Sequence, residues 1–312
     1  MRLQRLTLCC LLFLLPTLTH AKIVFKSSSA AGSDIYVMDD DGRNAKILVK
    51  RVDGRSLMWP AWSPNGEQIA FLQEPPGAPK WPQKFAIYII ESDGTGEFQV
   101  TDGDHNDATT MSWSPDGKYL AFTSDRLARM TDAWTVNIAT KALRRLTRTV
   151  SLTTEVTWSP DGKYMAYRDN ISGHTTIHLM RADGSGQHEL VKGKAGHWRD
   201  SPSWSVDSQS VVYYERNGHS EKVVIHNIKH NRRQVVDTPA NWSIHGACFM
   251  GSNHLLISAK GLNGNPDKYD IYRYHLVTGK SVNLTNTPTV DDYMADWISD
   301  DVLSVSPQGK KK

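Results

Sequence analysis

Acidic, imidazole and aromatic side chains recur in six short stretches of this chain, each of which ends at a tryptophan or a phenylalanine. The stretches are RSLMWPAW (55–62), DHNDATTMSW (104–113), LTTEVTW (152–158), HWRDSPSW (197–204), NWSIHGACF (241–249) and DDYMADW (291–297). Their side chains that could do chemistry are Asp107, Glu155, His197, Asp200, His245 and Asp292, together with the aromatic Trp59, Trp198, Trp242 and Tyr293. If the six stretches meet in the fold, these ten residues form a candidate binding site.

Three interpretations of such a site remain open from the residue types. Carboxylates beside imidazoles are typical ligands of a divalent cation such as calcium, although no particular metal follows from them. Aromatic rings beside carboxylates are equally typical of sites for a sugar ring or a peptide. The third interpretation is a channel mouth lined by hydrated polar groups without a ligand. No other cofactor is indicated.

Two further features bear on function. The Pro-rich stretch QEPPGAPKWPQKF (73–85) indicates a stiff surface loop, in which Trp81 is a separate candidate contact residue. No G-x-S-x-G motif occurs in the chain, so a hydrolase with a serine nucleophile is disfavoured.

The six stretches recur because the chain itself is built of repeats. WSPDGKYLAF (113–122) and WSPDGKYMAY (158–167) are nearly the same ten residues. The aromatic residues that open these segments are Trp62, Trp113, Trp158, Trp204, Phe249 and Trp297, with successive spacings of 51, 45, 46, 45 and 48 residues. Periods in this range predict repeated structural units, here six.

Each unit predicts four short antiparallel strands. A first strand ends at the aromatic opener, a Ser-Pro-Asp-Gly turn leads to the second strand, and an Asp-Gly turn joins the third strand to the fourth. Proline and glycine interrupt the pattern too often for a helical repeat. Four short strands per repeat are typical of a propeller blade. We therefore expect an all-β, six-bladed propeller of four-stranded antiparallel blades, with the opener rings buried between blades.

The chain begins in the middle of a unit, which predicts how the ring closes. KIVFKSS (22–28) matches a second strand, and residues 293–298 match a first strand without a complete blade behind them. One blade shared between the N- and C-termini would remove the exposed edges of an open array. Residues 302–306 also match a second strand, so the sequence leaves open whether 22–27 or 302–306 completes the closing blade.

The alternation of strand direction separates two rims. The loops that lead into the first strands share one rim with the variable loops, and the short Ser-Pro-Asp-Gly turns share the other. Because variable loops suit recognition, we expect the site at the variable rim and channel mouth. In the fourth and fifth units Ser208 and Asn253 stand where the turn has glycine, which predicts looser turns there and a stabilising effect of Ser208→Gly.

WSPDGKYLAFTSDR (113–126), together with DIYVMDDDG (34–42), resembles the WD-repeat-like repeat of TolB-like six-bladed propellers. The resemblance covers residues 22–312 and concerns the propeller part only. It implies a location in the periplasm or outside the cell. Because the same repeats accompany α/β-hydrolase peptidase domains and occur in some polysaccharide lyases, it also implies an enzymatic alternative.

Residues 1–21 have the pattern of a secretory signal peptide, with Arg2 and Arg5 ahead of an apolar run at 6–15 and small residues at 19 and 21. We therefore expect residues 22–312 to be a single exported domain, periplasmic or secreted. Without residues 1–21 only Cys248 of the three cysteines remains, so no internal disulfide is expected.

Charge argues against nucleic acid as a partner, and hydropathy argues against membrane insertion. The loss of Arg2 and Arg5 from the 36 basic residues leaves 34 against 33 acidic ones, without a basic stripe for nucleic acid. No other segment approaches the roughly 18 consecutive apolar residues of a membrane span, so stable membrane insertion of the mature chain is not expected. We expect a monomer.

Two functions follow from these observations. The favoured one is a non-catalytic binding or scaffold propeller that recognises an envelope or extracellular protein or glycan through its variable rim and channel mouth. The alternative is a carbohydrate-active enzyme, a polysaccharide lyase or hydrolase, with a metal-assisted site at the channel mouth. Such an enzyme needs an acid and a base at hydrogen-bond distance, and the sequence assigns neither.

Overall fold

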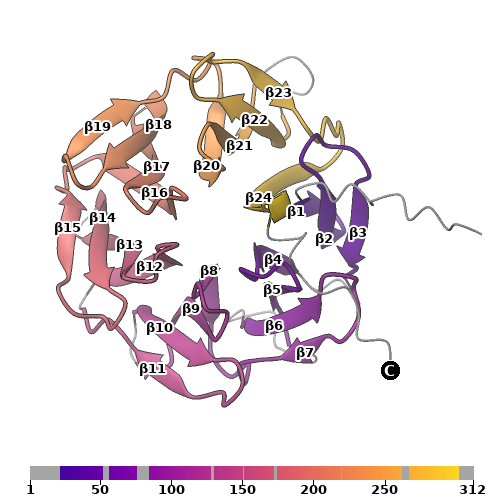
Figure 1. The fold of residues 1–312 in the computed structure, drawn as a ribbon, viewed down its shortest axis with the longest axis vertical. Coiled ribbons are helices and arrows are strands. Elements are labelled where there is room, and N and C mark those ends of the chain that lie inside the picture. The colour runs from indigo at the N-terminus through magenta and orange to yellow at the C-terminus, as the bar shows by residue number, and fades with distance from the viewer. Residues whose placement is uncertain are drawn as a thin grey trace, which may run out of the picture.

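The fold is a ring of six β-sheets. The computed structural model describes residues 22–51, 56–75, 84–127, 130–149, 151–171, 174–218, 220–261 and 267–301. In this part of the chain 24 strands form six sheets of four antiparallel strands, arranged around a central axis (Figure 1). The predicted all-β, six-bladed propeller is therefore confirmed. Trp81 and residues 302–306 lie outside the described residues.

Three blades come from the first half of the chain. From the inner to the outer edge their strands are β4 (Leu57–Trp62), β5 (Gln68–Gln73), β6 (Ala86–Glu91) and β7 (Phe98–Gln99); β8 (Asp107–Trp113), β9 (Tyr119–Ser124), β10 (Asp132–Asn137) and β11 (Leu143–Arg145); and β12 (Leu152–Trp158), β13 (Tyr164–Ile171), β14 (His174–Arg181) and β15 (His188–Val191).

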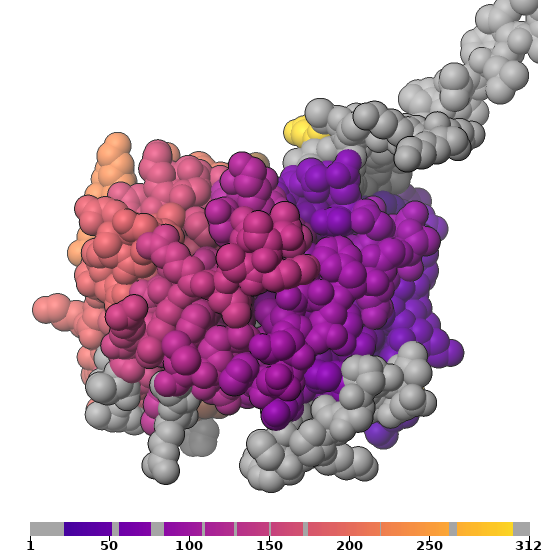
Figure 2. Space-filling view, turned by 90° about the horizontal axis from the view of Figure 1, so that it is seen from below, coloured from indigo at the N-terminus to yellow at the C-terminus, as the bar shows by residue number. Residues whose placement is uncertain are grey.

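The other three blades complete the ring, and the last of them contains both ends of the described chain. Their strands are β16 (His197–Trp204), β17 (Ser210–Asn217), β18 (Ser220–Asn227) and β19 (Arg232–Val235); β20 (Ser243–Met250), β21 (His254–Lys260), β22 (Asp270–His275) and β23 (Ser281–Asn283); and β24 (Asp291–Ile298), β1 (Lys22–Ser29), β2 (Gly32–Asp39) and β3 (Lys46–Val49). Figure 2 shows, on the side of the ring that faces the viewer, consecutive parts of the chain lying against one another. Among the residues just delimited, no helical segment has the length and hydropathy needed to cross a bilayer.

The ring closes through the pairing of β1 with β24. The two strands run antiparallel, from the pair Lys22–Ile298 at one end to the pair Ser28–Asp291 at the other. The prediction of a blade shared between the two termini is confirmed, with residues 22–29 as its second strand. This pairing gives the closing blade the same four antiparallel strands as the other five blades.

The opener rings lie between blades, as predicted. Trp62, Trp113 and Trp204 are 6–7% exposed, whereas the other three openers are half-buried. The indole Nε1 of Trp113 donates to the carbonyl oxygen of Ala61 in the preceding blade at 3.1 Å, and that of Trp204 donates to Thr157 at 3.2 Å. Each ring thus joins two blades by packing and, in these two cases, by a hydrogen bond.

The turns after the inner strands share one hydrogen-bond pattern. In the third blade Ser159 Oγ donates to Asp161 at 2.7 Å and accepts from the Tyr164 backbone N–H at 2.9 Å. The fourth blade repeats these bonds around Ser205, and Ser208 takes the left-handed conformation (φ 59°) that glycine takes elsewhere. The prediction of looser turns is wrong: the Ser208 N–H donates to the Ser205 carbonyl at 2.9 Å, as the glycines do.

In the fifth blade a different residue of the turn takes the left-handed conformation. Gly251 (φ 65°), two residues before Asn253, takes the left-handed conformation there. Asn253 is therefore not the substitute for glycine that its place in the repeat predicts. The shorter segment after Phe249 moves the turn toward its start, where a glycine is available.

Ser208 allows a test of the turn. Its Oγ accepts a hydrogen bond from the Asp161 backbone N–H at 3.0 Å, so Ser208→Gly loses a bond while it relieves the left-handed strain. Ser208→Ala loses the same bond and keeps the strain. We expect the glycine variant to be more stable than the alanine variant by about 1 kcal/mol in urea unfolding. Equal stabilities of the two variants would contradict the assigned conformation.

Candidate functional site

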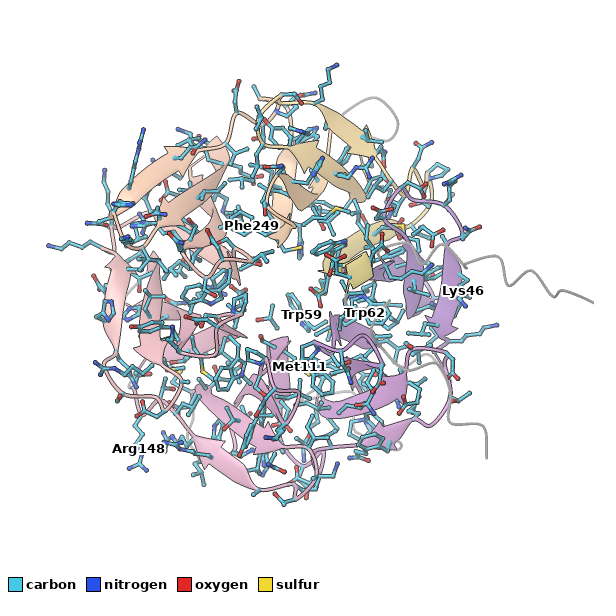
Figure 3. The ribbon with its side chains drawn as sticks, in the orientation of Figure 1. Lys46, Trp59, Trp62, Met111, Arg148 and Phe249 are labelled. Atoms are coloured by element: carbon cyan, nitrogen blue, oxygen red, sulfur yellow. The ribbon has the colours of Figure 1, made fainter. Side chains whose placement is uncertain are left out.

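The six stretches that carry the candidate residues form the inner strands of the blades rather than loops. Figure 3 places Trp59, Trp62, Met111 and Phe249 around the central opening, whereas Lys46 and Arg148 lie at the circumference. In each inner strand the pairing with the next strand shifts register a few residues before the opener. A bulge of this kind bends the strand and redirects side chains.

In β20 the bulge falls at His245, four residues before the opener Phe249. In the other five inner strands the bulge includes the third residue before the opener. In four of the six blades this residue has a left-handed backbone, namely Trp59, Glu155, Ser201 and Met294, with φ between 53° and 59°. Side chains other than glycine rarely adopt this conformation. Its recurrence at equivalent places marks the middle of the inner strands as the strained part of the ring, a property often found at binding sites.

A cavity of about 550 Å³ lies on the axis. Its lining includes Trp59, Thr110, Met111, Thr157, Ser201, His245 and Met294, and it extends to the Ser-Pro segments after the openers. The cavity therefore lies toward the face of the turns, which we call the turn face. The opposite face, where the inner strands begin at Asp107, Leu152, His197, Ser243 and Asp291, is the loop face. Of the ten candidate residues, Trp59 and His245 line the cavity.

Asp107 forms an ion pair at the start of β8. Its two carboxylate oxygens lie 2.7 and 2.8 Å from Nη2 of Arg126, and the side chain of Asp107 is fully buried. Arg126 also approaches Asp102, at 3.7 Å. This pair ties the inner strand to the segment after β9.

The carboxylates of Glu155 and Asp200 contact the same arginine, which joins two blades. Arg168, on β13, lies 3.6 Å from the carboxylate of Glu155 in its own blade and 2.7 Å from that of Asp200 in the next blade. Glu155 also accepts the Ser201 backbone N–H at 2.7 Å. Burial raises the pKa of Glu155 to about 7, against the opposing effect of Arg168, and burial also raises the pKa of Asp200. Both acids were predicted as candidates from the sequence, whereas Arg168 was not.

A second contact between blades uses Asp296, which the sequence analysis also missed. Its Oδ2 accepts the backbone N–H of Trp62 at 2.7 Å, and Ser112 Oγ accepts that of Trp158 at 3.0 Å at the equivalent place. Burial raises the pKa of Asp296 to about 6. Alignment of the residue before each opener would have found this position, since Asp296 is its single charged member.

His245 and Tyr293 meet at the inner edge of two neighbouring blades. Their ring centroids are 4.7 Å apart, and Tyr269 adds a third ring 5.6 Å from His245. Lys26 Nζ donates to Tyr293 Oη at 3.2 Å and lies 4.8 Å from the centroid of its ring. Burial lowers the pKa of His245, and the nearby Lys26 lowers it further. The sequence analysis missed Tyr269 and Lys26.

The remaining candidates do not join these groups. Trp242 is buried and packs on Tyr272 at 4.6 Å, as part of the core of its blade. Asp292 is buried and accepts a hydrogen bond from the Thr287 hydroxyl. His197 and Trp198 are half-buried where β16 begins, at the loop face. In the described ranges, no three His, Cys, Asp or Glu side chains gather closely enough to hold a metal ion.

Comparison of the sequence with known proteins identifies a family and two relatives. Residues 17–241 match the family model described as TolB beta propeller domain. An uncharacterized protein of Agrobacterium fabrum is 26% identical over 193 residues, which cover 58% of this chain and 61% of the relative. The Tol-Pal system protein TolB of Francisella tularensis subsp. holarctica is 25% identical over 181 residues, which cover 58% of this chain and 40% of the relative. The chain thus matches between 40% and 61% of the length of these relatives.

Solved structures resemble the fold. TolB from Acinetobacter baumannii has a TM-score of 0.64 at 19% identity, over 89% of this chain and 66% of that one. A putative TolB from Agrobacterium tumefaciens has a TM-score of 0.66 at 14% identity, over 90% and 99% of the two chains. An oligogalacturonate lyase from Vibrio parahaemolyticus reaches 0.60 at 12% identity, over 85% and 73%. At these identities the likeness shows the fold alone.

Proposed function

Because the chain belongs to the TolB beta propeller domain family, we propose that it is a non-catalytic binding propeller of the bacterial envelope that takes an extended polypeptide segment into its axial cavity. One observation carries the proposal: inner strands from all around the ring line one cavity of about 550 Å³. This volume lies within the usual range for ligand sites, roughly 300–1,000 Å³.

The lining supports a polypeptide as the ligand. It combines apolar surface from Trp59 and Met111 with the hydroxyl groups of Thr157 and Ser201, a mixture that suits alternating side chains and backbone amides. A relative that carries the name of the Tol-Pal system supports a protein partner in the same way. The pattern of residues 1–21 supports export to the periplasm.

The charges near the axis favour binding over chemistry. Asp107, Glu155 and Asp200 each contact an arginine. A lyase or hydrolase needs one group as acid and another as base on either side of a shared site. These three carboxylates instead hold strands and blades together, so no specific observation favours the enzymatic alternative.

The proposal is tested by panning a phage-displayed library of 12-residue peptides on the immobilised protein and on two variants. Thr110→Trp places at β8 the residue that β4 has at the equivalent position, Trp59, and it fills part of the cavity. Val277→Trp adds the same ring at an exposed site 79% accessible to solvent. We expect selected peptides to bind Thr110→Trp at least about tenfold more weakly than wild type, a loss of about 1.4 kcal/mol, and Val277→Trp unchanged.

Two outcomes would contradict the proposal. One is the recovery of no peptide above background. The other is equal binding of the selected peptides to Thr110→Trp and wild type, which would place their site outside the cavity. Melting curves of both variants serve as the control for folding.

A further inference from the structure

Lys26 is a nearly enclosed cation on β1, the second strand of the closing blade. The residue is 7% exposed, and its Nζ contacts the hydroxyl group and the ring face of Tyr293. Over the described part of the chain, no carboxylate lies within 4.0 Å of this ammonium group. A buried charge is costly unless it is paired, so the absence of an anion here calls for an explanation.

The repeat supplies an internal comparison. Lys26 is three residues beyond Ile23, which pairs with the opener Trp297, and Arg168 is three residues beyond Met165, which pairs with the opener Trp158. The two cations therefore occupy equivalent places on the second strands of their blades. They are the two basic residues among the six residues at this place, which are Lys26, Leu72, Thr123, Arg168, Tyr214 and Ser258.

The two cations differ in the residues at the positions that supply carboxylates to Arg168. Around Arg168 the carboxylates come from Glu155, three residues before the opener of its own blade, and Asp200, four residues before the opener of the next blade. Around Lys26 the equivalent residues are Met294 and Met58. The sequence thus has methionines at the two places that carry the carboxylates around Arg168. An anion that completes Lys26 must therefore come from outside this group of residues.

Neighbouring groups add to the positive charge and connect it to the cavity. Lys260 Nζ lies 5.1 Å from the centroid of Tyr269, and Tyr293 contacts His245, which lines the axial cavity. The carboxylate of the nearby Asp291 lies 3.0 Å from Lys268 Nζ and accepts the Tyr269 backbone N–H at 3.0 Å. Lys26, Tyr293, His245, Tyr269 and Lys260 thus form a chain of contacts that reaches the cavity at His245, and its positive charge comes from the two lysines.

We infer that Lys26 and the Tyr293 hydroxyl bind a side-chain carboxylate, from an aspartate or glutamate of the polypeptide segment in the axial cavity. The inference rests on the proposed function and specifies its ligand as an acidic peptide. A carboxylate on a flexible side chain can reach a cation that is 7% exposed, whereas one attached directly to a sugar ring brings the ring with it. An ammonium–carboxylate contact with an additional hydroxyl donor is a strong polar interaction in a site shielded from water.

One consequence concerns the protein without ligand. Lys26→Met removes an unpaired charge and keeps the length of the side chain, so we expect the melting temperature to rise by about 2–4 °C. A fall of the melting temperature would show that the protein itself compensates the charge, and the inference would fail.

The deciding experiment uses the peptides selected on wild-type protein. We expect them to share an aspartate or glutamate at one fixed position. The synthetic peptide should bind wild type about tenfold more tightly than its amide version with asparagine or glutamine, a difference of about 1.4 kcal/mol. Lys26→Met should bind both versions equally. Lys229→Met, which removes the same charge from an exposed turn, should keep the tenfold preference.

The outcomes separate the inference from the proposed function. Peptides that depend on the cavity but bind wild type equally as acid and amide would overturn the inference alone. A preference for the acid that persists in Lys26→Met would also overturn it. Binding of oligogalacturonate to wild type that is lost in Lys26→Met would overturn the assignment of the ligand as a peptide. If the panning selects no peptide, both the proposed function and the inference are contradicted.

Discussion

Replacing Arg168 by methionine is expected to lower the free energy of unfolding by about 3–5 kcal/mol at pH 8, because removal of one partner leaves buried charges without compensation. The guanidinium lies between Glu155 and Asp200 on two adjacent blades. Without it the two carboxylates face each other inside the ring, and both blades lose a shared contact. The loss should be smaller at pH 5, since burial raises the pKa of Glu155 to about 7 and the acid can then be protonated.

Urea unfolding of wild type and Arg168→Met at the two pH values measures this effect. Arg232→Met is the matched control, because Arg232 is exposed on the outer strand β19 and the substitution removes the same charge. We expect the control to change stability by less than about 0.5 kcal/mol. A loss in Arg168→Met that stays the same at both pH values would contradict the role assigned to Glu155.

Asp296→Asn is expected to become more stabilising, relative to wild type, as the pH rises from 4.5 to 8. Burial raises the pKa of Asp296 from 3.8 to about 6 in the folded state, so the folded protein holds this proton more tightly than the unfolded chain does. The stability contributed by the protonated group is therefore present below about pH 4 and is lost as the pH rises through about 6. Asparagine does not titrate and loses nothing over this range.

The expected size of the change is about 2 kcal/mol, from a pKa difference of roughly two units reduced for the partial exposure of the residue. The quantity to measure is the difference between the unfolding free energies of variant and wild type at each pH. This difference cancels the titration of all other groups. The change of this difference between pH 4.5 and pH 8 also cancels any constant cost of placing an amide where Oδ2 accepts the Trp62 N–H. A difference that does not vary with pH would contradict the raised pKa.

These two predictions concern the contacts that keep the inner strands together. Arg168 connects the third and fourth blades in chain order from β4, and Asp296 connects the closing blade to the blade of β4. Because the cavity is lined by inner strands from around the ring, a weaker contact between blades should also change its shape. The proposed ligand would then bridge blades and stabilise the closed ring by mass action.

The sequence predicts which segments lie near the axis, whereas their role as a binding site stays a prediction. The six stretches that precede the openers do line the centre of the ring, and Glu155, Asp200, His245 and Tyr293 do meet other candidate or charged groups there. The expected site at the loop face became a cavity toward the turn face, because the bulges redirect the inner strands between their two ends. Trp242 is a core residue, since its neighbour Tyr272 on β22 covers it.

The pairing of β1 with β24 in the folded protein decided that residues 22–29 form the second strand of the closing blade. The amino-acid sequence alone predicts six openers, four strands per unit and a blade shared between the two termini. These features follow from local turn chemistry and from alternation within a strand, which neighbouring residues specify. Tertiary structure alone decided which side chains meet near the axis. Arg168 contacts Asp200 and Asp296 contacts the Trp62 backbone N–H, because each partner comes from an adjacent blade. Contacts between blades depend on the rotation from one sheet to the next and on the bulge within each inner strand, and neither is written in any single repeat.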